Sequence, residues 1–159
     1  MKRLIAIFLL FTCFYSQAQE TKNFDLIIVI NDEIIREPLQ IGFIIKDEND
    51  SNQIVTTKGY LPGNLSLWQS DYEKLISNKT KGISIKFNYQ TYLYNEPFFY
   101  TYEIEYKKYW LQDGYNILRI YNLDKLKYKK IFKPLSANKN YTFELDSPSY
   151  TFKRIRKKQ

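Results

Sequence analysis

The stretch from Ile83 to Leu123 constrains the fold most, because apolar and polar side chains alternate along two long runs within it. Side chains of a β-strand point alternately to its two faces, so a period of two predicts a strand. Pro97 lies between the runs and is expected to separate two strands. The alternating apolar positions are Ile83, Ile85, Phe87 and Tyr89, followed by Phe98, Tyr100, Tyr102, Ile104 and Tyr106.

Asp113-Gly114 follows these runs, between Trp110-Leu111 and Tyr115-Asn116-Ile117. Asp-Gly tolerates the positive φ angles that a two-residue hairpin turn requires. The sequence therefore predicts a hairpin closed at Asp113-Gly114, with Gly114 in the left-handed region.

Shorter alternating segments flank this stretch on both sides, and the residues from Gly59 to Asn64, with Pro62-Gly63, predict a turn. Phe24 to Ile30 is a continuous apolar run, typical of a strand covered on both faces. The single helix signal is Ser70 with Glu73, which resembles a capping box and predicts about two helical turns. About nine short strands and one short helix indicate an all-β fold, an antiparallel β-sandwich of the transthyretin or immunoglobulin type.

Residues 1–18 have the pattern of a secretory signal peptide. Lys2-Arg3 is a basic start, Leu4 to Tyr15 is apolar, and Ser16-Gln17-Ala18 supplies small residues for cleavage. Cleavage after Ala18 leaves residues 19–159, expected to be one β-sandwich domain with a basic C-terminal end and no transmembrane segment. An uncleaved anchor, and a lipoprotein using Cys13, are the alternatives.

The cleaved segment holds the single cysteine, and the chain has no histidine. Disulfides, thiol nucleophiles, histidine-based triads and Cys/His zinc sites are therefore excluded from the mature chain. No cofactor or metal is expected, and we expect the protein not to be an enzyme. The expected location is secreted, periplasmic or on the outer surface.

Charge is distributed unevenly along the chain, whose net charge is +7. Residues 19–124 carry 11 basic and 15 acidic residues, whereas residues 125–159 carry 11 basic and two acidic ones. For an exported protein this favours anionic envelope lipid or polysaccharide as a partner, and not nucleic acid. The residues expected to contact an anionic surface are Lys153, Arg154, Arg156, Lys157 and Lys158.

The chain has 15 tyrosines, and most lie between Ile83 and Leu123. An exposed aromatic strip on a sheet would be a stacking surface for sugar rings or for a protein partner. The alternative is a two-sided sheet with partly buried rings whose hydroxyls reach water. The residues proposed for the strip are Tyr100, Tyr102, Tyr106, Tyr109 and Trp110.

Two acidic groups have alternative interpretations. Glu103 and Glu105 share one strand face, at a spacing that does not exclude a glycosidase pair, but the nearby Lys107 and Lys108 favour ion pairing. The loop from Asp47 to Asn52 starts like a calcium loop. It lacks the turn glycine and the final bidentate glutamate, which favours a hairpin loop.

Residues 37–92 resemble the carboxypeptidase-regulatory-like, transthyretin-like module common in secreted and surface proteins of Bacteroidetes. Glu37-Pro38-Leu39, Ile44 to Asp47, Thr56 to Leu61 and Ile83 to Tyr89 carry the resemblance, and Asn88 departs from it by replacing a glycine. The resemblance implies a seven-stranded sandwich used as an accessory or adhesive module, without catalytic residues. The expected function is a secreted, envelope-associated binding module. The alternative is a structural or assembly accessory that pairs with a protein partner through its Tyr-rich sheet.

Overall fold

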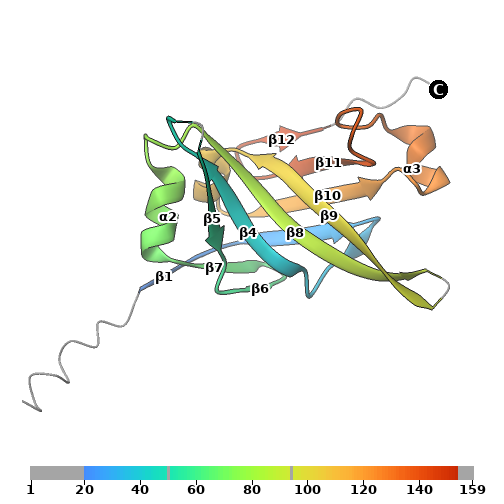
Figure 1. Ribbon diagram of the computed structural model, residues 1–159, viewed down its shortest axis with the longest axis horizontal. Coiled ribbons are helices and arrows are strands. Elements are labelled where there is room, and N and C mark those ends of the chain that lie inside the picture. The colour runs from blue at the N-terminus through green and yellow to red at the C-terminus, as the bar shows by residue number, and fades with distance from the viewer. Residues whose placement is uncertain (1–19, 50, 94, 154–159) are drawn as a thin grey trace, which may run out of the picture.

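The computed structural model describes residues 20–49, 51–93 and 95–153 (Figure 1). Three sheets form the body. One contains β12 (Thr151–Phe152), β11 (Tyr141–Asp146), β10 (Asn116–Asn122), β2 (Leu26–Ile30) and β3 (Glu33–Ile34), in that order. The second contains β5 (Asn52–Thr56), β4 (Leu39–Lys46), β8 (Gly82–Leu93) and β9 (Glu96–Tyr106). The third contains β1 (Thr21–Phe24), β7 (Asn64–Trp68) and β6 (Gly59–Leu61).

The four-stranded sheet crosses the five-stranded sheet, and a single large apolar core draws on all three sheets (Figure 1). Phe43 of β4, Tyr102 and Ile104 of β9, and Leu118 of β10 are among its fully buried members. The expected all-β sandwich is therefore confirmed.

One pair of strands departs from the antiparallel expectation. β2 runs parallel to β10, with Leu26 opposite Asn116 and Ile30 opposite Ile120. β2 is the continuous apolar run that the sequence marks as covered on both faces, and it lies between β10 and β3 in the sheet interior. Buried strands of this kind suit parallel pairing, since both of their faces are covered.

The two alternating runs form strands, as expected, and pair with each other as the long hairpin of β8 and β9. Pro97 does not separate them, because it lies inside β9 opposite Tyr92. The pairing of the hairpin extends from Ile83 opposite Tyr106 to Leu93 opposite Glu96. Asn95, in the connection between the two strands, has a φ angle of 68°, in the left-handed region. Asparagine tolerates this conformation better than most residues. β4 pairs with β8 only as far as Asn88, so the distal part of the hairpin is a two-stranded arm, visible beyond the body in Figure 1.

The predicted hairpin at Asp113-Gly114 is wrong. A 3-10 helix, η1 (Lys108–Gln112), follows β9, and β10 then pairs with β2 and β11 in the opposite sheet. Gly114 does not have a positive φ. The physical reason is burial. The 3-10 helix η1 directs both Trp110 and Leu111 into the core, whereas in a continued strand these two neighbours would face opposite sides.

Helices cover the two ends of the sandwich. α2 (Gln69–Ile76) has the predicted length and buries Tyr72 and Leu75, but it begins after Trp68 and has no side-chain cap, so the predicted capping box is absent. A second short helix, α3 (Leu126–Ile131), was not expected from the sequence. Its Tyr128 packs with Tyr121, Leu123 and Phe132 in a small separate cluster.

Two turns follow their sequence signals. Pro62-Gly63 joins β6 to β7, and Gly63 has φ of 89°, which glycine adopts without steric penalty. The loop after Asp47 joins β4 to β5 as a hairpin. The Asp47 carboxylate accepts hydrogen bonds from the backbone of Asn49 and Ser51, which is the ordinary turn role of aspartate.

Candidate functional site

β9 lies at the edge of its sheet, so one side of its backbone has no neighbouring strand. At Glu103 the side chain of Tyr141 occupies the position of the missing strand. The Glu103 N–H donates to the Tyr141 hydroxyl at 2.9 Å, and the same hydroxyl donates to the Glu103 carbonyl at 2.7 Å. Lys139 Nζ also donates to this carbonyl, at 2.6 Å. The edge of β9 is thus closed at Glu103.

Backbone groups of successive strand residues face opposite sides, so those of Thr101 and Phe99 face away from β8 like those of Glu103. Neither residue makes a further backbone hydrogen bond across this edge within the described chain. The exposed side of β9 therefore offers unpaired N–H and C=O groups beside the closed position.

Three of the five residues proposed for an exposed aromatic strip are buried. Tyr102, Tyr106 and Trp110 are at most 3% exposed, because strand alternation and η1 direct them into the core. The Tyr102 hydroxyl donates to Asn122 Oδ1 across the sandwich at 2.9 Å. Burial raises the pKa of Tyr102 and of Tyr106. The proposed strip is corrected accordingly, and these three rings are core residues.

The other two proposed residues reach the surface. Tyr109 is 47% exposed, and Tyr100 is half-buried. Burial, and a hydrogen bond to the Asp124 carboxylate, raise the pKa of Tyr100. Both residues line surface hollows along β9, although different ones.

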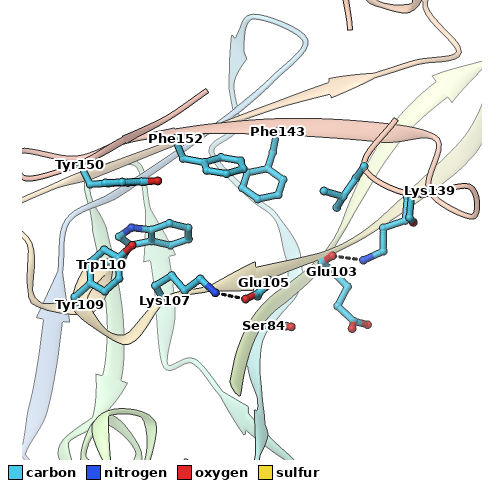
Figure 2. Close-up of a pocket in the computed structure, with 12 residues that line it drawn as sticks. Ser84, Glu103, Glu105, Lys107, Tyr109, Trp110, Lys139, Phe143, Tyr150 and Phe152 are labelled. Atoms are coloured by element: carbon cyan, nitrogen blue, oxygen red, sulfur yellow. Dashed lines mark hydrogen bonds and ion pairs between the residues drawn. The ribbon is translucent and has the colours of Figure 1, made fainter. Parts of the chain in front are cut away.

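The first hollow, called here the aromatic hollow, has a volume of about 490 Å³ and lies between β9 and β12. Figure 2 shows Tyr150, Phe152 and Phe143 along one wall, opposite Glu103 and Glu105. Its lining residues from β8, from β9, from η1 and from the junction of β9 with η1 are Ser84, Glu103, Glu105, Lys107, Tyr109 and Trp110. Those from the C-terminal part are Leu135, Ser136, Lys139, Phe143, Tyr150 and Phe152.

The aromatic hollow is lined by two acidic and two basic residues. Lys107 forms an ion pair with Glu105, and Lys139 bonds the Glu103 backbone (Figure 2). The Glu103 carboxylate has no ion-pair partner in the part of the chain that the structure describes. The expected ion pairing therefore holds for Glu105, and Glu103 presents the free carboxylate.

One of the residues that line the aromatic hollow has an unpaired buried donor. Trp110 is 3% exposed, and its indole N–H has no hydrogen-bond partner among the described residues. The ring contacts Tyr150 with centroids 6.4 Å apart, and Tyr109 at 5.8 Å. Buried polar groups are paired in most proteins, so this unpaired N–H is an exception beside the hollow.

The second hollow, called here the outer hollow, continues along β9 toward the hairpin tip and has a volume of about 620 Å³. It shares Glu103 and Lys139 with the aromatic hollow. The two hollows together are called the edge groove. The other residues of the outer hollow are Phe98, Phe99, Tyr100, Thr101, Asp124, Asn138, Asn140 and Tyr141.

Several groove residues were not proposed from the sequence. Phe98 and Phe99 are 42% and 54% exposed on the arm, and Tyr150 is 43% exposed beside β12. The adjacent aromatics Phe98-Phe99 carried a usable signal, because two neighbours on a strand cannot both face one core. Tyr150 had no such signal, since its place depends on contacts with Tyr109 and Trp110, about 40 positions earlier in the chain.

The basic C-terminal end lies mostly outside the described residues. Lys153 is exposed. Arg154, Arg156, Lys157 and Lys158 lie outside the described residues, as does the predicted signal peptide at residues 1–18. Contact between this end and an anionic surface stays a prediction. Across the described ranges, no helix is long and apolar enough to cross a membrane, and no cluster of three potential metal-ligating residues occurs.

Comparison of the chain with protein-family models, curated proteins and solved structures finds no match. The resemblance to the carboxypeptidase-regulatory-like module therefore stays a prediction. The fold and the edge groove define the chain as a β-sandwich with a surface groove along one sheet edge.

Proposed function

We propose that this protein is a non-catalytic binding module, exported to the cell envelope, that holds an extended ligand in the edge groove. The observation that carries the proposal is the continuity of the two hollows along β9. They share Glu103 and Lys139, and both have aromatic and polar lining. Ligand sites are concave, largely apolar and equipped with a few polar groups, which fits this groove.

The lining favours binding over catalysis. Glu105 is engaged with Lys107, and Glu103 lies on the same strand, so the two carboxylates do not face each other across a cleft. The aromatic walls supply large contact areas at low cost in conformational entropy. An extended polysaccharide or polypeptide of the envelope is the class of ligand that a groove of this length suits.

A second candidate is a structural or assembly accessory that pairs with a protein partner. The unpaired backbone of Phe99 and Thr101 favours it, because open strand edges are sites of strand pairing. In this second candidate, binding itself is the function, and the partner is a component of an envelope assembly.

The proposal can be tested with arrays of envelope polysaccharides, oligosaccharides and peptides. Tyr109→Ala removes a groove residue, and Tyr115→Ala is the matched control, since both side chains are 47% exposed and Tyr115 lines neither hollow. We expect at least tenfold weaker binding by Tyr109→Ala and unchanged binding by Tyr115→Ala. No binding on any array, or equal binding by the two variants, would overturn the proposal.

A further inference from the structure

The open part of β9 has the geometry of a sheet that lacks its next strand. We propose that the outer hollow takes an extended segment of another polypeptide, which adds to β9 as an antiparallel or parallel strand. This inference rests on the proposed function and names the class of ligand. Strand addition of this kind is a recurrent mode of peptide recognition.

The position of the added strand is marked by Tyr141. Its hydroxyl satisfies the Glu103 N–H and C=O, which are the groups that a neighbouring strand would bond. The same groups of Thr101 and Phe99 lie on the same side of β9 and are unpaired in the described chain. Five of the six residues from Phe98 to Glu103 line the outer hollow, which therefore follows β9 over a length of about 20 Å in a strand.

From Phe98 to Tyr102, β9 lacks the usual protection of an exposed edge, although Pro97 precedes this segment in the same strand. Natural edges are blunted by lysines, prolines or bulges. Between Phe98 and Tyr102 the sequence has no charged residue and no proline, and the pairing of β8 with β9 is continuous. Two-stranded hairpins are marginally stable alone, so a third strand would stabilise the arm.

The side chains beside this edge define the partner's chemistry. Phe99, Thr101 and Glu103 share the outer face of β9, and Phe99 is 54% exposed. An added strand would place one apolar side chain beside Phe99 and a basic one beside the free Glu103 carboxylate. A polysaccharide has no regular row of N–H and C=O groups that would match the backbone of Phe99 and Thr101.

A substitution at one backbone position, Thr101, distinguishes strand addition from binding through side chains alone. Thr101→Pro removes an N–H that faces away from β8, a substitution that edge strands tolerate. Thr101→Ala is the matched control, because it keeps the N–H and loses the same hydroxyl, which donates to Asn88 Oδ1 at 2.8 Å. Thermal unfolding shows whether each variant is folded.

The experiment presents the mature chain to a displayed library of random 12-residue peptides, with an oligosaccharide array in parallel. We expect enriched peptides that alternate β-branched or aromatic residues with basic ones, and at least tenfold weaker binding by Thr101→Pro than by Thr101→Ala. If Thr101→Pro fails to fold, the best peptide is instead N-methylated at alternate amides. Methylation of the alternate amides that face β9 should abolish binding, and methylation of the amides that face away from it should preserve binding.

The outcomes distinguish this inference from the proposed function. Peptide binding that is unaffected by Thr101→Pro and by both N-methylated sets would overturn strand addition. Binding of oligosaccharides alone, weakened by Tyr109→Ala, would overturn it and leave the proposed function standing. Absence of binding to both libraries would overturn both.

Discussion

The hydroxyl of Tyr141 bonds both the N–H and the carbonyl of Glu103, at 2.9 and 2.7 Å. Through this one residue the β11 strand of one sheet closes the edge of β9 in the other. Tyr141 is 7% exposed, and its ring packs edge-on against Tyr102 at 5.1 Å. The contact therefore joins the core to the edge groove at Glu103, which lines both hollows.

Replacing Tyr141 with Phe should destabilise the fold by about 1–3 kcal/mol, because the Glu103 N–H loses its partner while the ring remains. Urea unfolding of wild type and Tyr141→Phe measures the difference. Tyr115→Phe is the control, since its side chain is 47% exposed. Equal unfolding free energies for Tyr141→Phe and wild type would show that the contact contributes nothing to stability.

Gly42 of β4 should not tolerate a side chain. A Cβ atom built there would lie 2.7 Å from the Val55 carbonyl oxygen, which is fixed in β5. Overpacking of this kind destabilises by about 1–3 kcal/mol, so Gly42→Ala should lower the melting temperature. Gly59→Ala has open space and serves as the control. A Gly42→Ala variant as stable as Gly59→Ala would contradict the β4–β5 packing.

Tyr121 should make the fold sensitive to alkali. Burial, then the neighbouring Glu144, raises its pKa to about 12, whereas an unfolded tyrosine ionises near 10. Between these values the unfolded chain loses a proton that the folded chain keeps, so stability falls as pH rises through this window. At pH 11, wild type should lose about 1 kcal/mol more than Tyr121→Phe, relative to pH 8. Parallel losses in the two proteins would refute the assignment.

Export is tested at the N-terminus. If the signal peptide is cleaved after Ala18, mass spectrometry of the protein from envelope or medium fractions should find Gln19, or its cyclised form, as the first residue. Cytoplasmic protein that retains Met1 would contradict the proposed location and with it an envelope ligand.

Local patterns in the sequence predict the parts of this fold that depend on neighbours along the chain. The alternation of Ile83 to Tyr89 and of Phe98 to Tyr106 predicts β8 and β9, and Pro62-Gly63 predicts the turn between β6 and β7. These features depend on strand period and turn geometry, which short segments determine.

The parts that the sequence did not predict depend on contacts between distant segments. The parallel pairing of β2 with β10 joins residues about 90 positions apart, and Tyr141 lies 38 positions from Glu103. Alternation predicts that Tyr102 and Tyr106 share a face, but the face that is buried is decided by the opposite sheet. The edge groove combines residues of β9 with residues from Asp124 to Phe152, and no local pattern predicts that these distant segments line one groove.

Amide hydrogen exchange along β9, followed by NMR, tests the open edge most directly and requires no ligand. The backbone amides of Tyr102 and Ile104 face β8 and should exchange slowly. The amide of Glu103 should be protected by the Tyr141 hydroxyl. Thr101 and Phe99 should exchange much faster than these three, because their amides face the outer hollow unpaired. Protection of Thr101 and Phe99 equal to that of Ile104 would show that the edge is already occupied and would contradict the account.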